Sequence, residues 1–279
     1  MSEGISRHQP NPINMNIIFR ELKAHYKGLI GWSVGMLFLV IAGMAKYGAI
    51  ATGGQQAIQL FKTFPKPVLV IAGINGLDVS TVIGYFGVLY LYILLMASIH
   101  GAMIGAEVIS KEERDRTSEF LYPKPITRSK IVTEKLVAAI INIAILNIIT
   151  TVCSIFTVAF YAKDFSNNNM ILVLMTGLFI MQILFFSLGS ALAGLFKNPK
   201  LPSIVATAIL LVTYIIWVVV DLNANLDFLK YVTPFKYFDA SVIIKNGNLD
   251  PLYIILSGVI IVVLITTAYI TFNKRDLKV

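Results

Sequence analysis

The sequence predicts an all-α integral membrane protein with about six transmembrane helices. Hydrophobic residues make up 57% of the 279-residue chain and charged residues 14%, whereas a soluble domain is roughly 45–50% apolar and about 25% charged. The mean hydropathy is +0.77, and the apolar residues gather in runs long enough to cross a bilayer, about 20 residues each. These runs fill so much of the chain that we expect one transmembrane domain over residues 1–279.

Six apolar runs have the length of membrane spans. We expect these spans near residues 28–47, 81–104, 136–161, 170–196, 203–220 and 252–272. Two longer loops are expected over 51–80, where Gly and Pro recur, and over 221–250. Residues 13–27 alternate apolar and charged side chains, which predicts a short interfacial elbow helix leading into the first span. The alternative is a simple cytoplasmic extension of that span.

Small residues four apart mark positions where helices can approach closely. Gly31 and Gly35 have this spacing in the first span, Gly101 and Gly105 in the second, and Ser190 and Gly194 in the fourth. Such pairs allow close contact between helix backbones in membranes. The sequence leaves open whether these contacts form within one chain or between two chains.

The basic residues predict the orientation of the chain in the membrane. With the N-terminus in the cytoplasm, 16 of the 23 Lys and Arg residues fall on the inner side and 7 on the outer side. Because cytoplasmic loops carry the excess of positive charge, we expect both termini inside, in the plasma membrane of a bacterium. The basic residues that give the net charge of +8 lie between the apolar runs. This distribution fits anionic membrane lipids as partners and not nucleic acid. Cys153 is the single cysteine and is expected to be a small packing residue.

The predicted spans carry no Asp, Glu, Lys or Arg in their middle parts. Ion-coupled carriers usually keep an ionisable group at depth, so the sequence disfavours an ion-coupled secondary carrier, which we keep as an alternative. His100, near the inner end of the second span, is the one candidate for a proton relay. We expect it instead to be an interfacial histidine with an ordinary hydrogen bond.

The charged segment over residues 107–135, between the second and third spans, is the most informative part of the chain. Its first half has helical character, and Pro123 and Pro125 are expected to end that helix. A second helix is expected to start near Thr127 or Ser129 and to run into the third span. The result would be a cytoplasmic coupling helix, held between two membrane helices, that can pass a push from a soluble partner into the bundle.

This segment resembles the type-2 exporter family of ATP-binding cassette (ABC) permeases. The family carries a Thr-x-Glu-x-Leu run, then Pro-x-x-Arg, then an aliphatic residue and a Lys that leads into a span. The residues that match are Thr117, Glu119, Leu121, Pro125, Arg128, Ile131 and Lys135, preceded by Glu112 and Glu113. Arg116 stands where a glycine is common, and Pro123 is an additional proline. The six-span layout, the loop over 229–247 and the basic tail also resemble the family.

The resemblance implies a permease half-transporter that pairs with a second permease subunit, as a homodimer or a paralogous heterodimer. It implies that residues 107–128 dock a separate ABC ATPase subunit. The ATPase-coupling residues would be Glu107, Glu112, Glu113, Arg116, Thr117, Glu119, Leu121, Pro125, Arg128 and Lys135. The chain contains no G-x-x-x-x-G-K-[ST] loop, so ATP and Mg are expected in the partner, and we expect no cofactor and no enzymatic site here. Without the resemblance, these charges read as a solvated loop that only sets topology.

The long loop before the last span contains aromatic residues at helical spacing: Phe228, Tyr231, Phe235 and Phe238. We expect them on one face of a short helix that dips into the outer interface. They would form either an extracellular gate over the export path or an aromatic belt at the interface. The stretch over 61–75 is expected to pair with them as a second outer cap.

Two other classes of protein fit parts of the sequence. Glu112 and Glu113 resemble the start of the E-E-x-x-x-R motif of CAAX-type proteases, but Thr117 stands at the arginine position. All three histidines also occur by residue 100, which disfavours a membrane protease. A membrane sensor or scaffold protein remains as an alternative to the exporter. The cargo is not readable, although charge-free spans favour an amphipathic or hydrophobic substrate such as a peptide antibiotic, toxin peptide, drug or lipid.

Overall fold

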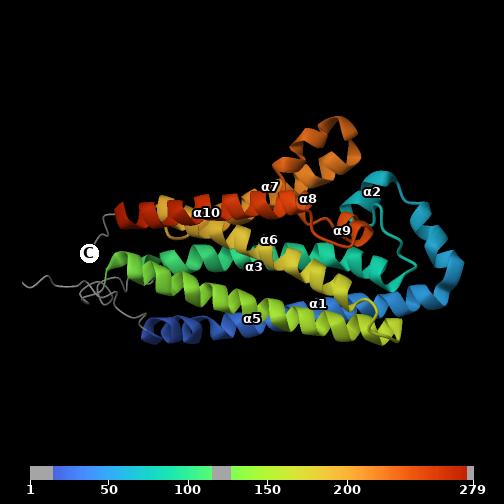
Figure 1. Ribbon diagram of the computed structural model, residues 1–279, viewed down its shortest axis with the longest axis horizontal. Coiled ribbons are helices and arrows are strands. Elements are labelled where there is room, and N and C mark those ends of the chain that lie inside the picture. The colour runs from blue at the N-terminus through green and yellow to red at the C-terminus, as the bar shows by residue number, and fades with distance from the viewer. Residues whose placement is uncertain (1–14, 115–126, 275–279) are drawn as a thin grey trace, which may run out of the picture.

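The protein is a bundle of long helices that lie side by side (Figure 1). The computed structural model describes residues 15–114 and 127–274, and this part of the chain contains helices and no strand. The first helix starts and the last helix finishes at the same end of the bundle, which we call the terminal end. The opposite end carries residues 63–81 and 223–250, and we call it the cap end.

Six helices are long and apolar enough to cross a membrane, which confirms the predicted fold class. They are α1 (Met15–Lys62), α3 (Val82–Arg114), α5 (Arg128–Ala162), α6 (Asn168–Leu195), α7 (Leu201–Leu222) and α10 (Pro251–Lys274). Each contains one of the six predicted spans. In a bilayer every backbone polar group needs an internal partner, which is why each apolar run forms a continuous helix.

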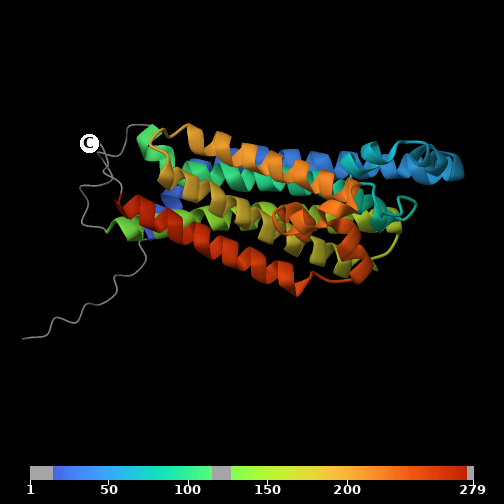
Figure 2. The same ribbon diagram turned by 90° about the horizontal axis from the view of Figure 1, so that it is seen from above.

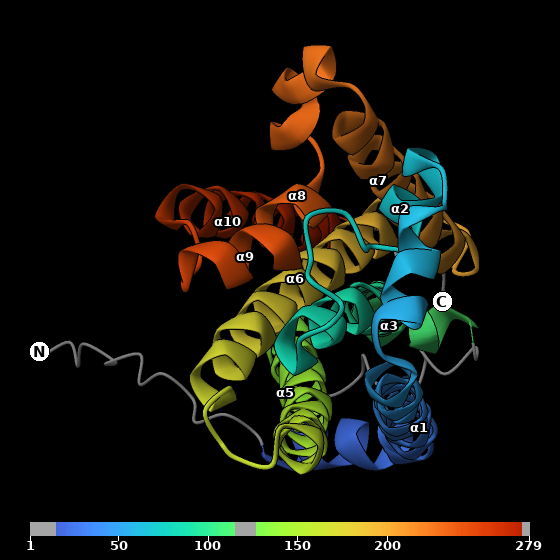
Figure 3. The same ribbon diagram turned by 90° about the vertical axis from the view of Figure 1, so that its right-hand side faces the viewer.

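Helix α1 is longer at both ends than predicted. The segment 51–62, predicted as loop, continues the helix to Lys62. Its Ala, Gln, Ile and Leu residues favour helix, Gly53 and Gly54 cost only about 1 kcal/mol each, and the first proline is Pro65. The predicted elbow helix is not a separate element, because residues 15–27 belong to the same helix as the span. Figure 3 nevertheless shows the dark-blue first turns extending sideways from the rest of α1, toward α5.

Helices α3 and α6 form the centre of the bundle, and their contact is the most extensive in the structure. A Cβ atom built on Gly105 would lie 2.1 Å from the Phe186 carbonyl oxygen, and one on Gly101 would lie 2.4 Å from that of Gln182. The hydroxyl of Ser190 also donates a hydrogen bond to the Gly105 carbonyl (3.3 Å). The small residues of the second and fourth spans therefore pack against each other within one chain.

The remaining membrane helices surround this pair. Helix α1 packs mainly on α5, and α10 packs mainly on α6, so α1 and α10 lie on opposite sides of the bundle (Figures 2 and 3). Helix α5 begins at Arg128 after the extended residue Thr127, which confirms the predicted start of the third membrane helix. Helix α10 exposes much of its apolar surface, because only 11% of its membrane window is buried inside the chain.

The cap end is built from short helices where two loops were predicted. They are α2 (Lys66–Ile71), the 3₁₀ helix η1 (Ala224–Tyr231), α8 (Pro234–Tyr237) and α9 (Ala240–Asn246). Gly73 follows α2 with φ +74°, and Gly247 ends α9 with φ +76°, a left-handed conformation that glycine adopts without steric cost. The Asn75 amide of the first capping segment donates to Asp221 at the end of α7 (3.3 Å), and Gly76 lies against Ser241 of the second, where a Cβ atom built on the glycine would be 3.4 Å from the serine Cβ.

The prediction that four aromatic residues share one face of one helix is wrong. Phe228 and Tyr231 lie in η1 and are 66% and 49% exposed, whereas Phe235 and Phe238 are 1% exposed. Pro234 separates the two pairs, because proline cannot donate the hydrogen bond that would continue a helix. Thr233 before it is extended, with φ −104° and ψ 112°. The buried pair packs in the core, and the exposed pair remains on the surface of the cap.

Candidate functional site

The terminal end holds what the structure describes of the predicted coupling segment. Glu107 is half-buried in α3, and Glu112 and Glu113 lie in the last turn of that helix. Arg128 is the first residue of α5, and Lys135 follows two turns later. The other five predicted coupling residues, Arg116, Thr117, Glu119, Leu121 and Pro125, lie outside the described residues. The coupling helix therefore stays a prediction, while the two helices that flank it are in place.

Lys135 connects these two flanking helices. Its side chain is 1% exposed, and its ammonium group donates a hydrogen bond to the Val108 carbonyl oxygen (2.9 Å). Val108 belongs to α3 and Lys135 to α5, so the two ends of the predicted coupling segment are bonded to each other. Burial of an ammonium group costs free energy unless the group is paired. Acidic residues are therefore expected close to Lys135.

Glu21 of α1 supplies negative charge to this region, and the sequence analysis did not single it out. Its side chain is 1% exposed, and its carboxylate contacts Arg20 (2.9 Å) and Lys111 of α3 (3.4 Å). Lys135 of α5 is also close enough to attract it. We call Glu21, Arg20, Lys111 and Lys135 the terminal-end charge cluster. The cluster joins the first turns of α1 to both helices that flank the coupling segment.

A second polar group lies deeper in the bundle, beside the same three helices. The Nδ1 atom of His100 is 2.9 Å from the Gln182 side-chain amide of α6, and the imidazole ring packs edge-on against Trp32. His100 is 3% exposed and therefore buried between the helices, and it makes the ordinary hydrogen bond that was expected. Asn142 of α5 and Glu107 line a cavity of about 50 Å³ with it.

At the cap end, Asp239 holds together three separate segments. One carboxylate oxygen accepts a hydrogen bond from the Trp217 indole of α7 (3.1 Å), and the other accepts from the backbone N–H of Ser241 (2.9 Å). Lys236 of α8 lies 3.3 Å from Asp239 and also pairs with Asp221 at the end of α7. Because Asp239 caps α9 while it binds α7, it fixes the position of the buried aromatic pair.

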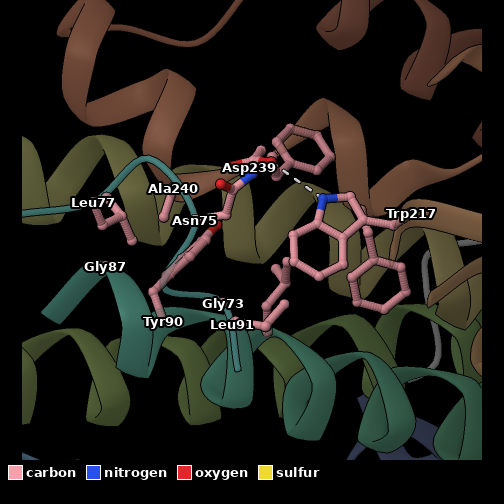
Figure 4. Close-up of a pocket in the computed structure, with 12 residues that line it drawn as sticks. Gly73, Asn75, Leu77, Gly87, Tyr90, Leu91, Trp217, Asp239 and Ala240 are labelled. Carbon is pink, nitrogen blue, oxygen red and sulfur yellow. Dashed lines mark hydrogen bonds between the residues drawn. The ribbon is translucent and has the colours of Figure 1, made fainter. Parts of the chain in front are cut away.

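Asp239 and Trp217 line a small cavity, which we call the cap pocket (Figure 4). Its volume is about 20 Å³, and it lies between α3, the loop after α2, α7 and α9. Phe235 and Phe238 form part of its wall, and Tyr90 of α3 lies across the pocket from Asp239. Two of the four residues predicted as an outer gate therefore line this mostly apolar pocket, which has a few polar groups, and Phe228 and Tyr231 do not.

Lys236 gives a testable pH dependence to the cap. Burial disfavours its ammonium, but the charges of Asp239 and Asp221 outweigh this effect and raise the pKa of Lys236 above its ordinary value of 10.5. A raised pKa means that the pair stabilises the fold below about pH 10.5 and that this contribution is lost as the pH rises through the folded-state pKa. We expect the melting temperature of Lys236→Gln to be lower than that of the wild type by a constant amount from pH 7 to 10. Thermal unfolding at higher pH should show this gap closing, and a gap independent of pH would contradict the assignment.

Six apolar helices in one bundle define a multi-pass membrane protein. A family model described as ABC-2 family transporter protein matches residues 15–277, so the chain belongs to this family and is an ABC transporter permease. This confirms the resemblance noted in the sequence. Permeases of the family are membrane transport subunits that in general work with an ABC ATPase subunit. A comparison with curated proteins gave no match.

The functional candidates that sequence reasoning missed are single charges with distant partners. Glu21 and Lys111 are 90 positions apart, and Trp217 and Asp239 are 22 apart. One signal was available for Glu21, because it is the one acid among Arg20, Lys23 and Lys27. For Asp239, the signal was its position directly before a short helix, where Asp is a favoured N-cap residue.

Proposed function

We propose that the chain is the permease subunit of an exporter that moves an amphipathic or hydrophobic substrate out of the cell. A separate ABC ATPase subunit that binds ATP and Mg supplies the energy. The terminal end faces the cytoplasm and the cap end faces outside, in the plasma membrane of a bacterium. The observation that carries the proposal is the family match together with a buried charge cluster at the ends of the helices that flank residues 115–127.

The route of coupling follows from that cluster. A push on the segment between Arg114 and Arg128 acts first on the ends of α3 and α5. Because Lys135 bonds to Val108 (2.9 Å) and Lys111 lies 3.4 Å from Glu21, neither helix can shift without affecting α1. The coupling residues Glu119 and Arg128 would meet the ATPase, and the charge cluster would pass the motion on. Two permease subunits, identical or paralogous, would enclose the path.

An apolar cargo is supported by a groove on the surface of α1 and α3. Its volume is about 750 Å³, and Phe38, Leu89 and Tyr92 are among its mostly apolar lining residues. Lys46 is the one charged residue that lines it. Binding sites for small molecules are typically concave and apolar with a few polar groups, which suits an amphipathic molecule. The groove adjoins the cap end, because Ala72, Ile74 and Val79 also line it, and this is the side where an exporter would release its cargo.

The coupling role can be tested by reversing charges in the predicted coupling segment. We expect Glu119→Lys and Arg128→Glu to leave the protein folded and ATPase activity present, but to reduce transport per ATP hydrolysed by about tenfold or more, because like charges would then meet at the docking surface. The measurement is ATP hydrolysis and transport by membrane vesicles that contain the chain and the ABC ATPase encoded beside it.

Lys197→Glu is the matched control, because Lys197 is exposed in the turn between α6 and α7 at the same end of the bundle. It changes the charge of the chain by the same amount as Arg128→Glu, and by an equal amount of opposite sign to Glu119→Lys. Normal export by Glu119→Lys and Arg128→Glu would remove both residues from the coupling role. Transport without any ATPase, driven by an ion gradient, would instead favour the secondary carrier.

A further inference from the structure

The charged group beside the cap pocket has an unbalanced negative charge, and one of its members, Asp239, lines the pocket. Asp221 and Asp239 have side chains that are 9% and 6% exposed, and both contact Lys236. Within the part of the chain that the structure describes, Lys236 is the one cationic group that lies within 4 Å of either carboxylate. Hydrogen bonds from Trp217 and Ser241 stabilise Asp239, but they do not neutralise it. A largely buried charge without a counter-charge is costly, so a second cation is expected here.

Tyr90 gives an independent indication of a ligand. Its side chain is 1% exposed, and its hydroxyl group has no hydrogen-bond partner among the described residues. Buried hydroxyl groups are almost always paired. Tyr90 lines the cap pocket together with Asp239 and Asn75 (Figure 4). The amide nitrogen of Asn75 donates to Asp221 (3.3 Å), which leaves the amide oxygen of Asn75 available.

The size and the chemistry of the pocket define the class of ligand. A volume of about 20 Å³ has room for one particle of the size of a water molecule, since one water needs roughly 10–15 Å³ by this measure. The oxygen groups of its lining are a carboxylate, an amide oxygen and a phenol oxygen, which are hard ligands that suit alkali and alkaline-earth ions. The Asp239 carboxylate also accepts hydrogen bonds from Trp217, Lys236 and Ser241, so the ion would share it with these donors. Asp221, Asp239 and Lys236 together lack one positive charge, which favours a monovalent ion. We propose that the cap pocket binds one cation of the size of sodium between Asp239, Asn75 and Tyr90.

This ion would link four parts of the cap. Tyr90 belongs to α3, Asn75 to the loop after α2, and Asp239 caps α9 and is bonded to Trp217 of α7. Because Asn75 is exposed, the ion can enter from the solvent without unfolding of the cap. The stability of the cap would then depend on the sodium concentration on its side of the membrane. The proposal does not depend on the cargo, on the ATPase or on the direction of transport.

Trp217 is a built-in reporter for the experiment. The chain contains two tryptophans, Trp32 and Trp217, so Trp32→Phe leaves the emission of Trp217 alone. The purified protein in detergent is titrated with sodium chloride against choline chloride at constant ionic strength, and thermal unfolding is followed in both salts. We expect a saturable change in Trp217 emission and a higher melting temperature in sodium, because a ligand that binds only the folded state stabilises it. Choline is too large for the pocket and should produce neither effect.

Two variants test the ligands of the ion, and one serves as a control. Asp239→Asn should weaken sodium binding about tenfold or more, because it removes the charge that holds the ion. Tyr90→Phe should unfold at an equal or higher temperature than the parent in choline, where its hydroxyl is unpaired, and at a lower temperature in sodium. Asp227→Asn should not alter the titration, because Asp227 pairs with Lys230 on the surface of the cap.

Tyr90→Phe keeps the test decisive if Asp239→Asn does not fold, because the hydroxyl that it removes has no hydrogen-bond partner in the described part of the chain. Equal behaviour of Trp217 in sodium and choline would overturn the proposal and leave a single water as the occupant. A sodium effect of the same size in Tyr90→Phe as in its parent would overturn it as well. A response to potassium or lithium that follows the size of the ion would support it.

Discussion

Gly105→Ala is expected to destabilise the bundle by about 3 kcal/mol, toward the upper end of the cost of overpacking. The added Cβ atom would lie 2.1 Å from the Phe186 carbonyl oxygen, and backbone atoms cannot move aside as a flexible side chain can. Helices α3 and α6 would therefore have to separate along their contact. The melting temperature of the purified variant, measured by size-exclusion chromatography after heating in detergent, is the observable.

Gly31→Ala is the matched control for this experiment. Gly31 lies in α1 and belongs to the same type of small-residue pair as Gly105, but a Cβ atom built on it meets nothing within 4 Å. Alanine is favoured over glycine in a helix by up to about 1 kcal/mol, so this variant should be as stable as the wild type or more stable. Equal melting temperatures for the two variants would show that α3 and α6 do not approach as closely as described.

The contrast between these two glycines shows what the sequence could predict about packing. The spacing of Gly31 and Gly35 is the same as that of Gly101 and Gly105, and the sequence offers no means of ranking them. Only the positions of the neighbouring helices distinguish a glycine at which two helices cross from a glycine on an open helix face. Membrane helices associate mainly through close packing, so the local pattern marks candidates and the tertiary structure selects among them.

The membrane spans were predictable, and the ends of the helices were less so. Each predicted span lies inside one helix, because the length of an apolar run is fixed by the thickness of the bilayer. Helix α1 continues to Lys62 and α3 to Arg114, well beyond the apolar runs. Outside the membrane core hydropathy gives no signal, and helix propensity and contacts decide where a helix ends. The predicted loop over 51–80 was therefore only partly correct.

The candidate site residues also divide into those that the sequence predicted and those that it did not. Lys135 was predicted from a motif that is contiguous in the sequence, and the structure describes it as a buried group. Glu21 and Asp239 were not predicted, because each gains its importance from a partner on another helix, Lys111 and Trp217 respectively, and their local signals do not name that partner. A charged residue in an amphipathic segment is expected to be solvated. Glu21 is instead 1% exposed, whereas Phe19 on the same helix is 61% exposed.

Glu21→Gln is expected to have the other large effect, on the order of 3 kcal/mol, because it removes a buried carboxylate that pairs with Lys111 and attracts Lys135. Glu21 and Lys135 are each 1% exposed, so water screens their attraction little. Thermal unfolding of the purified variant provides the measurement. Lys23→Gln is the control: Lys23 is exposed in the same turns of α1, and the loss of a surface charge there should cost less than about 1 kcal/mol.

The double variant Glu21→Gln with Lys135→Met distinguishes a charge interaction from a general loss of packing. Replacement of both members of a buried ion pair by neutral groups is often tolerated, whereas the loss of one member is not. The double variant should therefore be more stable than the sum of the two single effects predicts, with a coupling energy of about 1–3 kcal/mol. Strict additivity would mean that Glu21 and Lys135 act separately. In that case the charge contact between α1 and the flanking helices would run through Lys111, and the charge-based route from the coupling segment to α1 would pass through α3 and not through α5.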